Sequence, residues 1–120
     1  MQEYHLCDSE YRFMQVVWDA APVASGRLVE LCAQELGWKK STTYTVLKRL
    51  CDKGIFQNNK GTVTSLISRK EFYSVQSERF VAETFSGSLP AFLTAFTARK
   101  NLSPEEVAHL KKMVAEYEED

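Results

Sequence analysis

Apolar residues in the first half of the chain recur at helical spacing in three consecutive segments. A residue that ends helices closes each segment: Pro22 closes the first, Gly37 the second and Gly54 the third. The pattern therefore predicts three short amphipathic helices. Their inward positions are Phe13, Met14, Val17 and Trp18 in the first, Leu28, Leu31, Cys32 and Leu36 in the second, and Thr43, Val46, Leu47 and Leu50 in the third.

Short polar residues mark the expected starts of two of these helices. Asp8 or Ser9 precedes the apolar positions of the first helix, and Ser41 or Thr42 precedes those of the third. The side chains of such residues accept hydrogen bonds from the free N–H groups of a first helical turn. We therefore expect the first and third helices to begin at these residues.

The apolar pattern changes period after Gly54. Two short runs, residues 55–57 and 63–67, are separated by Asn58, Asn59, Lys60 and Gly61, which are residue types typical of tight hairpin turns. The pattern predicts a β-hairpin with its turn at these four residues. Three short helices followed by a hairpin is the order of a winged helix-turn-helix domain.

The remainder of the chain reads as helix again, in residues 69–87, 88–101 and 103–120. The last helix has the clearest start, because Ser103 can cap it, Pro104 suits its first position and Glu106 completes a capping box. The predicted fold is mainly α with a small β-hairpin. Residues 1–69 would form a winged helix-turn-helix domain that binds DNA, and residues 70–120 a helical dimerisation region.

Charge is distributed unevenly along the chain, although the net charge is only −1. Residues 38–60 hold six basic side chains and one acid, whereas residues 101–120 hold six acids and two lysines, Lys111 and Lys112. The low net charge argues against a protein that coats nucleic acid uniformly. Contact with a polyanion would have to come from the local basic cluster.

The third predicted helix has a polar face opposite its apolar stripe. Ser41, Tyr44, Thr45 and Lys48 follow one another at helical spacing. Hydroxyl and basic side chains can bond base edges or neutralise phosphates, so this face predicts a recognition helix for the major groove. A solvated face and a protein-binding face are the alternatives. The expected DNA contacts are Lys39, Lys40, Ser41, Thr42, Tyr44, Thr45, Lys48 and Arg49, with Lys60 at the hairpin tip.

Phenylalanine, leucine and valine fill seven of the 17 positions from Phe80 to Phe96. Such a segment is too apolar for the outside of a monomer, and burial against a second copy would give a two-fold interface. A cap over the winged helix and a pocket for a small apolar ligand are the alternatives. The expected dimer contacts are Phe80, Phe85, Leu89, Phe92, Leu93 and Phe96, together with Leu110, Val114 and Tyr117 of the last helix.

Catalytic and metal-binding patterns are missing from the sequence. The two histidines, His5 and His109, have no ligand-type residue at metal spacing, and there is no phosphate-binding glycine loop. We therefore expect no enzyme activity, metal or cofactor.

Cys7, Cys32 and Cys51 lie far apart, which favours reduced thiols and a cytoplasmic location. We see no leader in the sequence and no apolar run of about 20 residues, so we expect neither export nor membrane insertion.

Four stretches of the sequence carry a family resemblance: YRFMQVVW, STTYTVLKRLCDKGIF, SLI and NLSPEEVAHLKKMV. Together they resemble the penicillinase-repressor family, which includes the BlaI, MecI and CopY repressors of β-lactamase, methicillin-resistance and copper-transport operons. The resemblance implies a homodimeric repressor that binds a palindromic operator through two winged helices and dimerises through interlocking C-terminal helices. On that match Thr42, Tyr44, Thr45 and Arg49 fall in the operator-contacting part of the third helix.

The same resemblance implies a switch by proteolysis. In the β-lactam branch a membrane sensor protease cuts the dimerisation helix before a phenylalanine, and the matching bond here joins Ala95 to Phe96, with alanine in place of the usual asparagine. Three other features of the sequence depart from the family pattern. The hairpin is short and lacks the family's aromatic and basic second strand, Tyr44 stands where a basic residue is common, and no cysteine follows Cys51 to match the copper branch's metal site.

Overall fold

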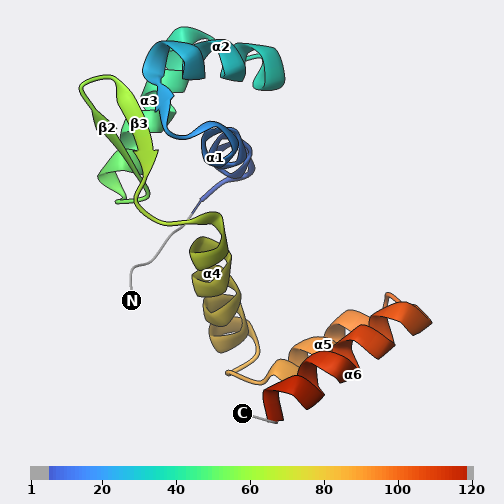
Figure 1. Cartoon of the computed structure of the whole chain (residues 1–120). Coiled ribbons are helices and arrows are strands. Elements are labelled where there is room, and N and C mark those ends of the chain that lie inside the picture. Colours follow the sequence, from blue (N-terminus) through green and yellow to red (C-terminus); the bar gives the residue numbers. More distant parts are fainter. Residues whose placement is uncertain (1–5, 119–120) are drawn as a thin grey trace. The chain divides into compact units, whose positions relative to one another are not determined.

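Six helices and three strands make up residues 6–118, which the computed structural model describes (Figure 1). His5 and the last two residues of the predicted C-terminal helix, 119–120, lie outside these residues. The elements in chain order are α1 (Asp8–Ala20), β1 (Val23–Ala24), α2 (Ser25–Leu36), α3 (Lys40–Asp52), β2 (Phe56–Asn59), β3 (Thr62–Ser65), α4 (Arg69–Thr84), α5 (Leu89–Thr97) and α6 (Pro104–Glu118).

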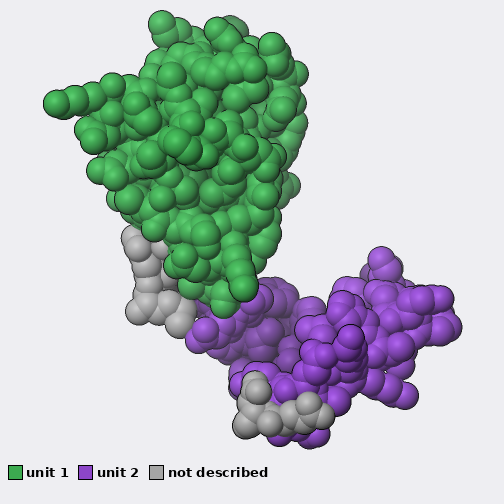
Figure 2. All heavy atoms as spheres, viewed as in Figure 1, with its two compact units in different colours: residues 1–76 green, residues 77–120 purple. Residues whose placement is uncertain are grey.

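The chain divides into two compact units, residues 1–76 and 77–120 (Figure 2). The division falls within α4, whose first residue, Arg69, is where the sequence pattern placed the domain boundary. Unit 1 contains α1, α2, α3 and the sheet. Unit 2 contains the second half of α4, from Ser77, together with α5 and α6.

Unit 1 has the order of a winged helix, which confirms the predicted fold class. α1 packs against α2, α2 packs against α3, and the hairpin of β2 and β3 follows. The sheet has one strand more than the predicted hairpin, because β1 pairs antiparallel with β3 through Val23 opposite Val63. The sheet order is therefore β1-β3-β2.

The hairpin turn is tighter than predicted. Asn58 and Asn59 belong to β2 and pair with β3, so only Lys60 and Gly61 form the turn. Both have positive φ angles, 53° and 88°, as the two central residues of a type I′ turn require. The Asn58 side-chain oxygen accepts a hydrogen bond of 3.1 Å from the Gly61 N–H, which closes the turn.

Every buried hydrophobic side chain among the described residues lies in unit 1. The Phe13 ring stacks on Trp38 at a centroid distance of 5.6 Å and meets Phe56 edge-on at 6.3 Å, which fixes α1 against the end of α2 and against β2. The buried set is Phe13, Met14, Val16, Val17, Val23, Leu28, Cys32, Val46, Leu47, Leu50, Ile55, Phe56, Val63 and Phe72. Trp18, Leu31 and Leu36, predicted to face inward, are only partly buried against this core.

The starts of two helices differ from the prediction. Cys7 is the N-cap of α1, where Asp8 or Ser9 was expected. Lys39 is the N-cap of α3, so the expectation of a cap at Ser41 or Thr42 was wrong. The α3 cap forms no side-chain hydrogen bond.

Other helix ends match the prediction. Gly37 ends α2 in the left-handed region and Gly54 follows α3 with φ 81°. At α6, the Ser103 hydroxyl accepts a hydrogen bond from the Glu106 N–H at 3.1 Å, and the Glu106 carboxylate accepts one from the Ser103 N–H at 3.0 Å. The predicted capping box is therefore confirmed.

Candidate nucleic-acid interface

Helix α3 has the two faces that its sequence predicts. Thr43, Val46, Leu47 and Leu50 are buried in the core of unit 1. The opposite face is exposed and carries hydroxyl and basic side chains. Its exposed members, with the residue before the helix, are Lys39, Lys40, Ser41, Thr42, Thr45, Lys48 and Arg49.

Tyr44 differs from the other predicted contacts because it is half-buried. Its hydroxyl lies 3.2 Å from the hydroxyl of Ser25, at the start of α2, and donates a hydrogen bond to it. The ring therefore lies on the flank of α3 rather than on the middle of its exposed face. On this flank a pocket of about 350 Å³ is lined by Tyr44, Leu47, Lys48, Cys51 and Asn58.

Ser25 connects three parts of the candidate interface. Besides accepting from Tyr44, it donates its backbone N–H to the Gly61 carbonyl at 2.8 Å. The hairpin tip, the start of α2 and the flank of α3 are thus held together at one residue. No sequence pattern predicts this contact, because hydroxyl groups 19 positions apart follow no helical or strand spacing.

Lys60 lies at the hairpin tip, as predicted, and its side chain is exposed. Since Gly61 next to it bonds Ser25, the turn that carries this lysine is anchored to the helical part of unit 1. The basic side chain at the tip and the basic side chains of α3 therefore belong to one connected framework.

A buried carboxylate lies on the other flank of α3. Glu10 of α1 is 4% exposed, and its Oε2 is 3.5 Å from Arg49 Nη1 and 3.7 Å from Lys53 Nζ. Its Oε1 accepts hydrogen bonds from the backbone N–H and the thiol of Cys7 at 3.1 and 3.3 Å. Burial by itself raises the pKa of Glu10, but these hydrogen bonds and the two cations outweigh it, so the pKa is lowered from 4.5.

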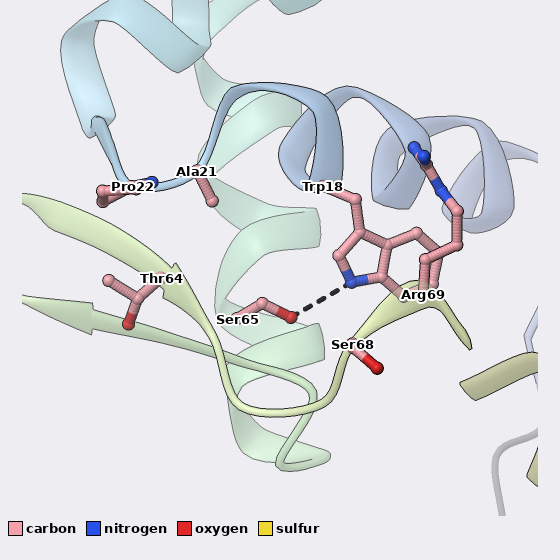
Figure 3. Close-up of a pocket in the computed structure, with 7 residues that line it drawn as sticks. All are labelled: Trp18, Ala21, Pro22, Thr64, Ser65, Ser68 and Arg69. Carbon is pink, nitrogen blue, oxygen red and sulfur yellow. Dashed lines mark hydrogen bonds between the residues drawn. The ribbon is translucent and has the colours of Figure 1, made fainter. Parts of the chain in front are cut away.

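A pocket of about 430 Å³ lies at the base of the sheet, lined by Trp18, Ala21, Pro22, Thr64, Ser65, Ser68 and Arg69 (Figure 3). Trp18 Nε1 donates to the Ser65 hydroxyl at 3.1 Å and to the Ile67 carbonyl at 3.1 Å. The Arg69 guanidinium lies 5.6 Å from the Trp18 ring centroid and pairs with Asp19 at 2.7 Å. These contacts link α1 to β3 and to the start of α4 around the pocket, while the buried Arg69 Nε has no hydrogen-bond partner.

The three cysteines are free thiols: Cys7 is exposed, Cys32 buried and Cys51 half-buried. Burial raises the pKa of the Cys32 and Cys51 thiols, which keeps both protonated at neutral pH. Within residues 6–118 no three side chains of histidine, cysteine, aspartate or glutamate come together as a metal site would need. In the same part of the chain, none of the helices combines the length and apolar character that crossing a bilayer requires.

Unit 2 gathers the phenylalanines that the sequence assigned to dimerisation. The ring centroids of Phe80, Phe85 and Phe92 lie 5.6 to 6.0 Å apart, edge to face, and Phe96 adjoins Phe92 at 6.0 Å. None of these rings is fully buried. Among the predicted dimer contacts, the exposed side chains are Phe80, Leu89, Phe96, Val114 and Tyr117, and the half-buried ones are Phe85, Phe92, Leu93 and Leu110. Met113 is also exposed, although the sequence pattern did not single it out.

The sequence has relatives among known regulatory proteins. The family model described as "Penicillinase repressor" matches residues 6–116. The penicillinase repressor of Bacillus licheniformis is 26% identical over 116 residues, which cover 93% of this chain and 91% of that protein. The methicillin resistance regulatory protein MecI of Staphylococcus aureus strain Mu50 is 21% identical over 115 residues, covering 92% and 94%. The protein of the same name from Mammaliicoccus sciuri is 20% identical, with the same coverage.

Proposed function

The chain belongs to the penicillinase repressor family, whose members are transcriptional repressors and not enzymes, and from this premise we propose that it represses its target genes by binding a palindromic operator as a homodimer. The observation that carries the proposal is the exposed hydroxyl and basic face of α3, presented by a winged helix. Such a face suits the major groove, where hydroxyls can bond base edges and lysines can neutralise phosphates.

The proposed operator surface has a centre and two edges. Ser41, Thr45 and Lys48 follow one another along the middle of the exposed face of α3. The Thr45 hydroxyl donates to the Ser41 carbonyl at 2.8 Å, so it meets DNA as a hydrogen-bond acceptor. Lys39, Lys40 and Thr42 extend the surface at the start of α3, Lys60 extends it at the hairpin tip, and Tyr44 and Arg49 lie at its edges.

The proposal of a homodimer is supported by the composition of unit 2. Its apolar side chains are numerous, yet no hydrophobic side chain from residue 77 to 118 is buried. Exposed apolar surface of this kind is typical of a face that another protein covers. A second copy of the chain is the simplest partner, since a two-fold dimer would also present two recognition helices to the two halves of a palindrome.

We also propose Ala95–Phe96 as the bond at which a membrane sensor protease would relieve repression. Both residues are exposed and lie in the last turn of α5. Proteases need an extended segment, so this turn must unwind before the bond is cut. The test is mass spectrometry after incubation with a relative's sensor protease: fragments 1–95 and 96–120 are expected, and a different cut would contradict this assignment.

The central experiment recovers the operator and measures the role of charge. Selection from a random duplex library should enrich a palindrome, and the affinity for it should fall steeply as salt rises, because each neutralised phosphate releases counterions. Lys48→Gln should weaken binding, whereas Glu30→Gln, an exposed change on α2, serves as the control. Selection of no common sequence, together with a flat salt response, would exclude operator binding and favour a protein-interaction module.

A further inference from the structure

Glu10 is the one acidic side chain that is buried among the described residues, and the surface proposed to bind DNA does not include it. It is the third residue of α1 and completes a capping box there, because its carboxylate accepts a hydrogen bond from the Cys7 N–H. Unlike most capping acids its side chain is also buried, and only 5% of its surface is accessible. A buried carboxylate is expensive unless cations and hydrogen bonds compensate it, so its partners define its role.

The two oxygens of Glu10 have different partners. Oε1 is fixed within α1 by the N–H and the thiol of Cys7. Oε2 has no hydrogen-bond partner and lies between Arg49 Nη1 and Lys53 Nζ. The carboxylate is therefore anchored to α1 and directs its charge at α3.

Arg49 is in the last turn of α3, and Lys53, one helical turn further on, is its C-cap, so both lie on the same flank of the helix. Successive residues are rotated by about 100°, which puts Tyr44 on the opposite flank. Like charges at this spacing repel each other, and one carboxylate between them removes the repulsion. Their side chains remain 49% and 30% exposed, so both cations lie at the edge of the proposed operator surface while their charge is shared with Glu10.

We propose that Glu10 is a positioning residue for operator binding, which holds Arg49 and Lys53 at the flank of α3 and withholds them from DNA phosphates. Lys48, in the middle of the exposed face, then becomes the main phosphate contact in the second half of α3. Non-specific affinity for DNA comes almost entirely from charge, so restraining two cations keeps it low and leaves recognition to the side chains at the centre. This inference rests on the proposed DNA-binding function.

The first test removes the charge of Glu10 without changing its shape. Glu10→Gln and the wild-type chain are titrated with a mixed-sequence 30-base-pair duplex at several salt concentrations. Each additional phosphate contact steepens the dependence of log affinity on log salt by about 0.9, so Glu10→Gln should show a slope steeper by about 0.9 for each of the two cations that reaches a phosphate, and tighter binding at low salt. The double variant Glu10→Gln/Arg49→Gln should return towards the wild-type slope. An unchanged or shallower slope in a folded Glu10→Gln protein would overturn the proposal.

The second test does not depend on that variant folding. Lys48→Gln and Arg49→Gln each remove one cation from neighbouring positions of α3 in the presence of Glu10. Lys48→Gln should reduce the slope by about 0.9, and Arg49→Gln by less than half as much. Equal reductions would overturn the role of Glu10 while leaving DNA binding intact. A wild-type chain with no salt-dependent binding would instead refute the proposed function itself, so the two failures are distinguishable.

Discussion

At the residue scale, the ionised Glu10 carboxylate makes the stability of unit 1 depend on pH. Its pKa in the folded protein is lowered from 4.5, because hydrogen bonds from Cys7 and the charges of Lys53 and Arg49 outweigh the effect of burial. A carboxyl group with a lowered folded-state pKa contributes its stabilisation in full above the unfolded-state value, here 4.5, and loses it as the pH falls through the folded-state value.

Comparison with Glu10→Gln isolates this contribution. At neutral pH the free energy of unfolding of the variant should be lower by on the order of 2 kcal/mol, because the variant loses charge-assisted hydrogen bonds and leaves two cations uncompensated. The difference should stay constant down to about pH 5.5 and shrink below about pH 4.5. Urea unfolding followed by circular dichroism measures it. Glu30→Gln, which breaks only an exposed pair with Arg27, should differ little from wild type at any pH.

Tyr44 and Ser25 act as a pair at the same scale. Their hydroxyls bond each other at 3.2 Å, so Tyr44→Phe and Ser25→Ala should each lower the unfolding free energy by about 1 kcal/mol, and the double variant by little more than either alone. Both should weaken operator binding similarly, because each frees the flank of α3. Additive losses of stability would show that the hydroxyls act independently. A loss of affinity confined to Tyr44→Phe would assign the tyrosine hydroxyl to a base contact.

At the scale of elements, the hairpin turn combines strain with a charge. Lys60 occupies the left-handed region with φ 53°, which is unfavourable for lysine and well tolerated by asparagine, the usual residue before glycine in a type I′ turn. Lys60→Asn should therefore stabilise unit 1 by about 0.5–1 kcal/mol. It should also weaken binding to all duplexes alike and reduce the salt slope by about 0.9 if the tip lysine contacts a phosphate.

Lys60→Gln is the matched control for this turn, since it removes the same charge without the turn preference of asparagine. It should reproduce the loss of affinity and not the gain in stability. Thermal unfolding and duplex titration measure the two effects separately. A gain in stability in both variants would mean that charge, rather than backbone strain, limits the stability of the turn.

The elements that could be predicted were those whose apolar residues recur at a regular spacing or whose ends carry capping residues. The apolar stripe of α3 and the capping box of α6 follow from residues that are neighbours in sequence, and both were confirmed. β1 could not be predicted, because two residues have no period and its partner Val63 lies 40 positions away. The burial of Glu10 could not be predicted either. An acid in a first helical turn is already explained by the helix dipole, and the two cations near Glu10 belong to a segment far away in the sequence.

At the scale of the whole molecule, the two units differ in how they bury apolar surface. Unit 1 encloses a core of its own, whereas Met113, Val114 and Tyr117 of α6 are exposed by 53%, 61% and 83%. The exposed phenylalanines that unit 2 contributes from α4 and α5 add to this surface. In the homodimer that we propose, a second copy covers this surface, so the stability of unit 2 would vary with protein concentration.

Val114→Glu tests this dependence, because a carboxylate placed in an apolar interface has no cation to compensate it. The wild-type chain should sediment as a dimer at micromolar concentration and unfold at a temperature that rises with concentration. Val114→Glu should sediment as a monomer, lose that concentration dependence and bind a full palindrome no more tightly than one half-site. Ala108→Glu adds the same group to the opposite face of α6, where Ala108 is exposed, and should remain a dimer. A monomeric wild-type chain, or a dimer that both variants preserve equally, would exclude α6 from the interface.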